Sequence, residues 1–234
     1  MKPITRTTTT ALLIVIAGGL FVPSTAQAQP PVFFTRESGP YFRVAVGAAI
    51  PQDGRLEQFG SFPAGNEVRY EVGLSSSFAG GFAFNRYLAA ELEMGANWNK
   101  IDSVNGFSVT DTFLYHFPIL ANAVLRCPIP HTGLVPYVGG GVGGSSTLFD
   151  TERFSNGAVT LVGSDSDFVF AWQAFAGLRF QLNEQMFVGL DYKYFAADSS
   201  SYRYPSLDYR GPDLSLRFEG MRSHLASLSF TFKF

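Results

Sequence analysis

The chain has 234 residues, with 17 basic and 19 acidic side chains and a formal net charge of −2. This balance argues against nucleic acid as a partner, because nucleic-acid-binding proteins carry a basic surface. Charged residues make up 15% of the chain and aromatic residues another 15%, whereas about 25% of an ordinary soluble domain is charged. The composition therefore favours a protein that turns apolar side chains toward lipid.

The first 28 residues have the pattern of an export signal. Lys2 and Arg6 give a basic start, residues 11–22 (ALLIVIAGGLFV) form a short apolar run, and Ala26-Gln27-Ala28 is an A-x-A cleavage site. The apolar run is too short for a transmembrane helix, which needs about 20 residues. Removal of residues 1–28 leaves 15 basic against 19 acidic residues. The single cysteine, Cys127, cannot form an internal disulfide, and we expect it to be buried near a turn.

Eight stretches after the signal alternate apolar and polar residues with the period of a β-strand. In residues 41–50, for example, Val44 lies on the face opposite Arg43, and in residues 88–98 Leu92 lies opposite Glu91 and Glu93. The faces of residues 134–145 are obscured by glycine. The expected strands are 41–50, 68–84, 88–98, 112–126, 134–145, 168–180, 186–195 and 223–234.

Short and long connections alternate strictly between these strands. The short ones are 85–87, 127–133 and 181–185, and the long ones are 51–67, 99–111, 146–167 and 196–220. Outer-membrane barrels have this rhythm, whereas a sandwich with crossing connections has no reason to keep it. The pattern predicts an all-β fold, an eight-stranded antiparallel up-and-down transmembrane β-barrel. We expect a signal peptide at 1–28, a short periplasmic leader at 29–38 and the barrel at 39–234.

The last strand supports a closed barrel. Phe230, Phe232 and Phe234 share one face, and small polar residues and a lysine occupy the other. As the edge of a soluble sheet such a strand would be prone to aggregate, but in a barrel it pairs with the first strand. Aromatic residues near the expected strand ends indicate girdles at the membrane surfaces; they are Tyr41, Trp98, Phe168, Tyr194 and Phe234.

Residues 80–95 (GGFAFNRYLAAELEMG), 136–143 (PYVGGGVG) and 174–195 (AFAGLRFQLNEQMFVGLDYKYF), with the Phe-ended last strand, resemble the OmpA-like and opacity-type small outer-membrane barrels. The resemblance covers about residues 39–234. It implies that Phe230, Phe232 and Phe234 form the signal recognised by the β-barrel assembly machinery. The peptidoglycan-binding domain of full-length OmpA-type proteins is not expected, so neither is direct anchoring to the cell wall.

The faces expected to point inward carry charges of both signs, and an unpaired charge in a narrow barrel is costly. One hypothesis is an ion-conducting lumen or gate, and the other is a salt-bridged plug, which we favour. The expected lumen network comprises Arg43, Arg69, Glu71, Glu91, Glu93, Arg126, Arg179, Asp191, Lys193 and Lys233.

Three patterns suggest catalysis, and each has a simpler explanation. Glu91 and Glu93 form a carboxylate pair suited to acid–base chemistry, but arginines across the lumen explain them equally well. The run 139–144 (GGGVGG) matches a dinucleotide fingerprint by chance, since no helix follows it. A lipid hydrolase using Ser223, His224 and Glu219 conflicts with strand geometry, because neighbouring strand residues point to opposite faces. We therefore predict no catalytic residue, metal or cofactor.

The last long connection is rich in tyrosine and arginine, which often supply binding hot spots. Its candidate surface comprises Tyr202, Arg203, Tyr204, Tyr209 and Arg210. A ligand-binding surface and a merely solvated loop are both open alternatives.

The sequence thus favours a non-enzymatic integral outer-membrane protein for envelope integrity or surface interaction. The alternatives are a narrow porin-like channel for small or apolar solutes and, third, a lipid-modifying hydrolase. Expected partners are outer-membrane lipid and lipopolysaccharide, the β-barrel assembly machinery, periplasmic chaperones and a host or surface ligand, but not nucleic acid.

Overall fold

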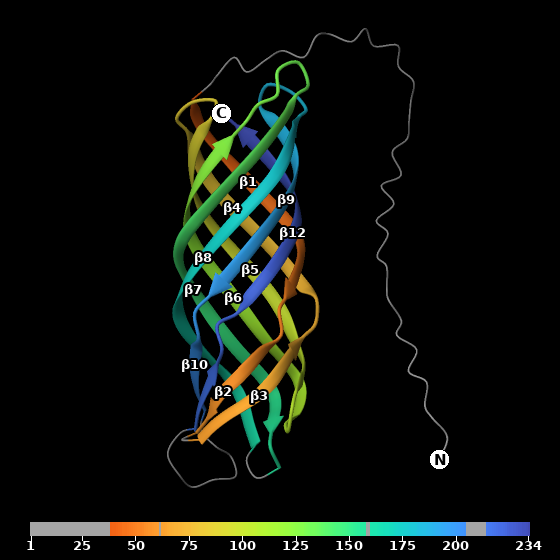
Figure 1. Cartoon of the computed structure of the whole chain (residues 1–234), viewed down its shortest axis with the longest axis vertical. Helices are drawn as coiled ribbons and strands as arrows, with labels where there is room; N and C mark the ends of the chain where they lie inside the picture. Colours follow the sequence, from red (N-terminus) through yellow and green to blue (C-terminus); the bar gives the residue numbers. More distant parts are fainter. Residues whose placement is uncertain (1–37, 61, 158–159, 205–213) are drawn as a thin grey trace, which may run out of the picture. The chain divides into compact units, whose positions relative to one another are not determined.

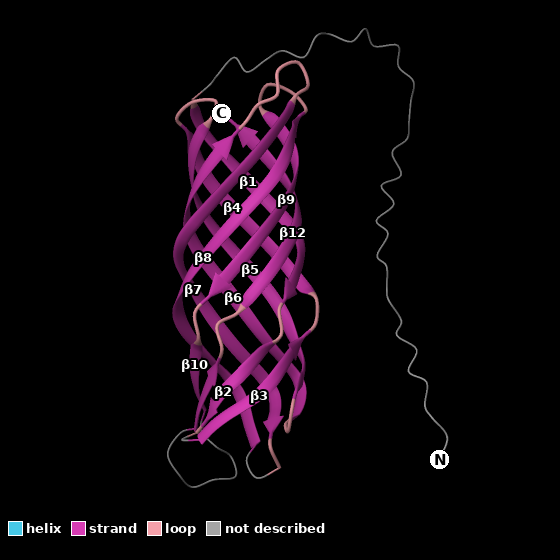
Figure 2. Ribbon diagram, viewed as in Figure 1, coloured by secondary structure: helices cyan, strands magenta, loops and turns pink. Residues whose placement is uncertain are grey.

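The computed structural model describes residues 38–60, 62–157, 160–204 and 214–234, so the expected signal peptide and leader lie outside the described residues. No helix in these ranges is long and apolar enough to cross a membrane. Strands dominate the described part of the chain (Figure 2). They are β1 (Gly39–Pro51), β2 (Gly54–Phe59), β3 (Phe62–Tyr70), β4 (Gly73–Ala83), β5 (Leu88–Val104), β6 (Ser108–Arg126), β7 (Leu134–Ser155), β8 (Thr160–Gln181), β9 (Met186–Ala197), β10 (Ser200–Tyr204), β11 (Leu214–Phe218) and β12 (Arg222–Lys233).

Eight of these strands close into a ring, which we call the membrane ring: β1, β4, β5, β6, β7, β8, β9 and β12. Every neighbouring pair is antiparallel, and the strands run obliquely around the barrel (Figure 1). β1 and β12 complete the ring in a register that runs from Tyr41 opposite Lys233 to Pro51 opposite Ser223. The predicted eight-stranded up-and-down barrel is therefore confirmed.

Two of the short turns are built in the same way around an asparagine. The side-chain oxygen of Asn85 accepts hydrogen bonds from the backbone amides of Tyr87 and Leu88. Asn183 accepts equivalent bonds from the amides two and three residues further on. An asparagine that bonds its own following backbone is a common device for a tight turn. Both turns lie at the same end of the ring, because each follows a strand of the same direction.

The outer face of the ring is apolar, whereas the inner face carries buried charged and polar side chains together with two small apolar clusters. On the outside, Val46 of β1, Leu92 of β5 and Leu190 of β9 are 54%, 57% and 64% exposed. On the inside, Arg43 of β1 and Glu91 of β5 are only 1% and 3% exposed. A soluble protein could not display such a band without aggregating. The band is instead what a bilayer requires of a barrel's outer surface.

Beyond the ring, strands replace the expected long loops. β10, β11, β2 and β3 form a sheet that joins the outer end of β5. β2, β3 and β10 lie toward the end opposite the C-terminal end of β12 (Figure 1). These four strands and the outer ends of β5 to β8 form what we call the distal barrel. The described parts of connections 51–67 and 196–220 therefore contain the paired strands β2, β3, β10 and β11, a correction to the sequence-based prediction.

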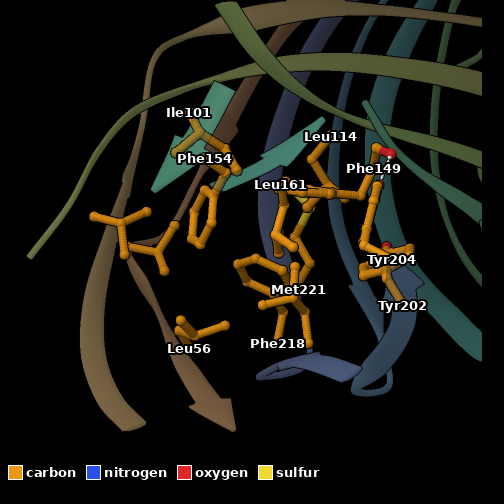
Figure 3. Packing of buried hydrophobic residues seen from close by; sticks show 13 residues of the cluster. Leu56, Ile101, Leu114, Phe149, Phe154, Leu161, Tyr202, Tyr204, Phe218 and Met221 are labelled. Carbon is orange, nitrogen blue, oxygen red and sulfur yellow. Dashed lines mark hydrogen bonds between the residues drawn. The ribbon is translucent and has the colours of Figure 1, made fainter. Parts of the chain in front are cut away.

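The distal barrel reverses the polarity of the ring. Its interior is a cluster of apolar side chains, the distal core (Figure 3). In β3, Val68 is fully buried while Arg69 points outward. Outside a bilayer the surroundings are water, so apolar residues gain most by facing inward. The distal core comprises Leu56, Val68, Ile101, Val104, Leu114, Phe149, Phe154, Leu161, Tyr202, Tyr204, Leu216, Phe218 and Met221.

Candidate functional site

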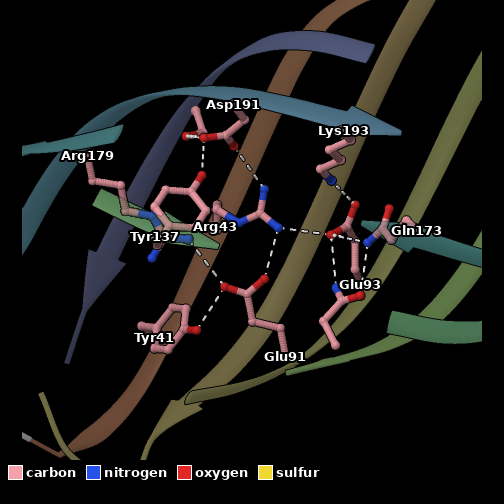
Figure 4. Close-up of polar contacts among 11 residues, drawn as sticks. Tyr41, Arg43, Glu91, Glu93, Tyr137, Gln173, Arg179, Asp191 and Lys193 are labelled. Atoms are coloured by element: carbon pink, nitrogen blue, oxygen red, sulfur yellow. Dashed lines mark hydrogen bonds and ion pairs between the residues drawn. The ribbon is translucent and has the colours of Figure 1, made fainter. Parts of the chain in front are cut away.

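The membrane ring is filled by a polar cluster centred on Arg43 of β1, which we call the lumen network (Figure 4). One guanidinium nitrogen of Arg43 lies 2.9 Å from carboxylate oxygens of both Glu91 and Glu93 on β5. Its other terminal nitrogen lies 3.2 Å from Asp191 on β9. Glu91 and Glu93 meet the same guanidinium because residues two apart on a strand share a face. One arginine thus links three carboxylates from two strands.

Two further cations complete the charge pairing. Arg179 of β8 lies 3.4 Å from Glu91, and Lys193 of β9 forms an ion pair with Glu93. The network then holds three cations and three carboxylates, all nearly inaccessible to solvent. A buried cluster with equal numbers of opposite charges avoids the large penalty of an isolated ion.

Neutral side chains donate further hydrogen bonds to the carboxylate oxygens of the network. The hydroxyl of Tyr41 donates to Glu91 at 2.8 Å, and that of Tyr137 donates to Asp191. Gln173 donates to Glu93 at 3.2 Å and to the side-chain oxygen of Asn122 at 2.9 Å. Each carboxylate thus accepts bonds from several donors, as buried charges require.

Sequence reasoning missed the two tyrosines. Tyr41 was expected in an outer aromatic girdle, but it points into the lumen and is 4% exposed. The signal was its odd position, two residues before Arg43 in the same alternating strand. Tyr137 lies in the glycine-rich strand β7, where the faces were obscured. Its ring packs under Arg179, with the guanidinium carbon 4.2 Å from the ring centroid.

The glycines of β7 make room for large side chains of the inner face. A Cβ atom built on Gly139 would lie 2.4 Å from the ring of Phe175 and 2.5 Å from the carbonyl oxygen of Ala123. Gly177 of β8 leaves space for the ring of Tyr137 in the same way. The run 139–144 therefore serves packing, in agreement with our interpretation of the dinucleotide match as chance.

The structure gathers six of the predicted lumen residues and separates the other four. Arg43, Glu91, Glu93, Arg179, Asp191 and Lys193 meet in the lumen network. Arg126 and Lys233 lie at the short-turn end of the ring beside a pocket. Arg69 and Glu71 are exposed outside the barrel, and Arg69 pairs with Glu67 at 3.2 Å. Residues 68–84 form two strands, β3 and β4, and not one. Even-numbered residues point inward in β3 and outward in β4, so the predicted placement of Arg69 and Glu71 in the lumen was wrong.

The predicted outer surface also needs correction. Tyr202 and Tyr204 are 0% and 1% exposed and belong to the distal core, whereas Arg203 between them faces solvent. The hydroxyl of Tyr204 donates to the carbonyl of Phe149 at 2.5 Å. Tyr209 and Arg210 lie outside the described residues. The two tyrosines of β10 therefore pack in the distal core and are not exposed loop residues available for ligand binding.

The candidate hydrolase residues do not come together. Ser223 is buried inside, whereas His224 faces outward. Both ring nitrogens of His224 have partners, the Tyr192 hydroxyl at 2.6 Å and the Gln52 amide at 2.9 Å. Within the described residues no group of three His, Cys, Asp or Glu side chains is placed to hold a metal ion. Cys127 is exposed, so the expectation that it is buried was wrong.

The family model for the outer membrane protein beta-barrel domain matches residues 13–234. The chain belongs to this family. As a member of the outer-membrane β-barrel family it is located in the outer membrane, so the ring is its membrane-spanning part. The short turns then face the periplasm, and the distal barrel stands outside the cell.

Solved structures of other small outer-membrane barrels are similar to this chain, and two of them, OprG and AlkL, share its fold. OprG from Pseudomonas aeruginosa is 12% identical, the match covers 86% of this chain and 100% of that one, and the TM-score is 0.59. AlkL is 16% identical over 89% of this chain and 98% of that one, with a TM-score of 0.52. Neisserial surface protein A is 15% identical over 85% and 100%, with a TM-score of 0.48. A search of curated proteins found no match.

Proposed function

We propose that this protein is a non-conducting, non-enzymatic barrel that supports the envelope and displays a folded surface outside the cell. The observation that carries this proposal is the double filling of the interior. The lumen network occupies the membrane ring, and the distal core occupies the space beyond it. An ion would have to displace paired charges at one level and apolar side chains at the other.

The energetics of both levels favour a permanently filled barrel. Taking one member out of a buried, paired charge cluster costs about 3–5 kcal/mol. The distal core includes five aromatic rings, and burial of one such side chain contributes about 1.5–3 kcal/mol. Thermal fluctuations open such packing too rarely to support steady ion flow.

Conductance in planar lipid bilayers tests this proposal. We expect no steady nanosiemens-scale channel from the full protein. The double variant Lys193→Ala/Glu93→Ala removes an ion pair without changing the net charge of the lumen, and we expect it to raise conductance. The control is Arg69→Ala/Glu67→Ala, which removes an exposed pair. A native protein that conducts as well as the lumen variant would overturn the proposal.

A role in the envelope predicts a phenotype in cells. Loss of the protein should increase entry of an apolar fluorescent dye through the outer membrane, and the native gene should reverse this. The control variant Arg69→Ala/Glu67→Ala should restore the barrier equally well. Unchanged dye entry after loss of the protein would argue against a role in envelope integrity.

The proposal includes biogenesis through periplasmic chaperones and the β-barrel assembly machinery, with lipid and lipopolysaccharide as surroundings. The outward ring of Phe42 lies 5.6 Å from that of Phe232 and 6.0 Å from that of Phe234. Phe234 remains 54% exposed at the rim. We expect Phe234→Ser to reduce the amount of folded protein in the outer membrane, measured by heat-modifiable migration in gels. Phe84→Ser, at an exposed Phe of a periplasmic turn, is the control.

A passage for apolar solutes is the second candidate, because the inner wall of the distal barrel is apolar. The contact between β8 and β10 also supports it, because side chains and not a backbone ladder join these two strands. Backbone amides of Ser201 and Arg203 donate to the carboxylates of Asp167 and Asp165 at 2.8 and 2.6 Å, in place of a strand ladder. Transfer of an apolar dye into proteoliposomes tests this function, and equal transfer by protein-free liposomes would exclude it.

A further inference from the structure

A small pocket opens at the periplasmic end of the ring, next to the lumen network and away from the distal core. Its wall is formed by the first residues of β1, β7 and β9 and the last residues of β6, β8 and β12. Arg126, Arg179 and Lys233 bring cationic side chains to this wall, and Thr231 adds a hydroxyl. The pocket has a volume of about 30 Å³, which exceeds the roughly 10–15 Å³ needed for one water.

Several polar atoms of this wall have no hydrogen-bond partner among the described residues. Thr231 is 4% exposed, and its hydroxyl oxygen bonds to none of these residues. The same holds for the Nε atoms of Arg126 and Arg179. A buried donor without an acceptor is energetically costly, so native structures rarely leave three together. All three residues line the same pocket, which indicates a missing acceptor.

The charge around the pocket indicates that the missing acceptor is negatively charged. The three carboxylates of the lumen network are already balanced by three cations of the same network. Arg126 forms no ion pair with an acid in the described part of the chain, and it donates to the backbone carbonyl of Asn85. The Tyr41 hydroxyl, also on the wall, is already bound to Glu91. The pocket therefore presents positive charge and free donors.

We propose that this pocket binds the phosphate or carboxylate group of a small periplasmic anion. Such a group offers two or more oxygen acceptors, which suits arginine donors and a hydroxyl that converge from different strands. Arg179 connects the pocket to the lumen network, because the same side chain holds Glu91 at 3.4 Å. A bound anion would thus add a fourth negative group beside the cations of the ring.

Isothermal titration calorimetry on the full barrel, refolded in zwitterionic detergent, tests the proposal. Inorganic phosphate and acetate are the two probes, and chloride is titrated at the same ionic strength. We expect saturable binding of one anion per barrel for at least one oxyanion probe. Phosphate binding alone assigns a phosphate ligand, and acetate binding alone assigns a carboxylate ligand. Equal heats with chloride, or no saturable heat with either probe, would overturn the proposal.

Two variants locate the binding at the pocket. Arg126→Gln and Thr231→Val should each weaken binding at least about tenfold, because hydrogen bonds to charged groups contribute about 1.5–3 kcal/mol. Arg86→Gln is the matched control, since Arg86 is an exposed arginine of a neighbouring turn and does not line the pocket. Heat-modifiable migration in gels establishes that each variant is folded. Unchanged affinity in either folded pocket variant would contradict the assignment.

Discussion

Arg43 is the side chain on which the interior of the membrane ring depends. It is 1% exposed and touches carboxylates from β5 and β9, so it joins opposite walls of the barrel. A lysine could not replace it, because a single ammonium cannot present several donors in a fixed plane. The sequence predicted that Arg43, Glu91 and Glu93 face inward, since all lie at odd positions of alternating strands. It could not predict which cation meets which acid, because pairing across a lumen depends on the stagger of strands far apart in the chain.

Replacement of Arg43 should therefore destabilise the barrel strongly. We expect Arg43→Met to lower the free energy of unfolding by about 3–5 kcal/mol, because it leaves buried carboxylates without their shared partner. Arg69→Met is the control and should change stability by less than about 1 kcal/mol, since Arg69 forms an exposed pair. Urea unfolding in lipid vesicles, followed by tryptophan fluorescence, measures both. Equal losses in the two variants would refute the central role of Arg43.

A second residue-scale prediction concerns Tyr202 outside the membrane. Burial in the distal core raises the pKa of the Tyr202 hydroxyl to about 12, from an ordinary value near 10. Its contribution to stability is therefore complete below pH of about 10, where the unfolded chain also keeps the proton, and is lost as pH rises toward about 12. Burial also raises the pKa of the Tyr70 and Tyr204 hydroxyls, so ultraviolet absorbance of tyrosinate should show several late-titrating groups, and their number should fall by one in Tyr202→Phe. In Tyr87→Phe, which removes an exposed tyrosine, the number of late-titrating groups should not change.

Among the elements, β7 departs most from a regular amphipathic strand, yet it pairs along most of its length with β6 and β8. Its glycines accept Phe175 and the β6 backbone at distances that exclude a Cβ atom. Periodicity alone predicted the strand but not its faces, because a glycine carries no side chain to mark one. The position of Tyr137 was hidden for the same reason.

Adding one methyl group to this strand should be costly. We expect Gly139→Ala to destabilise the barrel by about 1–3 kcal/mol, the usual cost of overpacking, because the ring of Phe175 and the carbonyl of Ala123 cannot both move away. Gly80→Ala on β4 is the control, since nothing lies within 4 Å of its added Cβ atom. Its effect should be neutral or slightly stabilising. Urea midpoints in the same vesicles compare the two, and similar midpoints would contradict the packing argument.

For the whole molecule, the strands cross two surroundings and change their patterning between them. β5 illustrates this change within one strand. Its inward residues are the charged Glu91 and Glu93 within the membrane and the apolar Ile101 and Val104 beyond it. The alternation of the ring was visible in the sequence. The distal strands were not, because they are short and irregular, with bulges in the pairing of β2 with β3 and of β3 with β5.

The distal barrel should therefore be rigid independently of lipid. We expect slow amide hydrogen exchange in β2, β3, β10 and β11 of the native protein, because their amides are paired over a buried core. Phe149→Ala should lower the free energy of unfolding of the distal barrel by about 3–5 kcal/mol and speed amide exchange in these four strands. The membrane ring should stay protected.

Phe168→Ala is the matched control for this measurement, since Phe168 is 69% exposed on the outer face of β8. Hydrogen exchange followed by mass spectrometry separates the two regions by peptide. Fast exchange throughout β2, β3, β10 and β11 in the native protein would mean that these segments behave as loops.

The junction of β1 and β12 constrains how the cylinder can enter a bilayer. It brings together the two ends of the described barrel, with the amide of Phe234 bonded to the carbonyl of Pro40 at 3.2 Å. Without that junction, two rows of bare peptide groups would meet hydrocarbon, at several kcal/mol for each group. Insertion must therefore coincide with closure of the cylinder, or another protein must shield both unpaired strand edges until they pair.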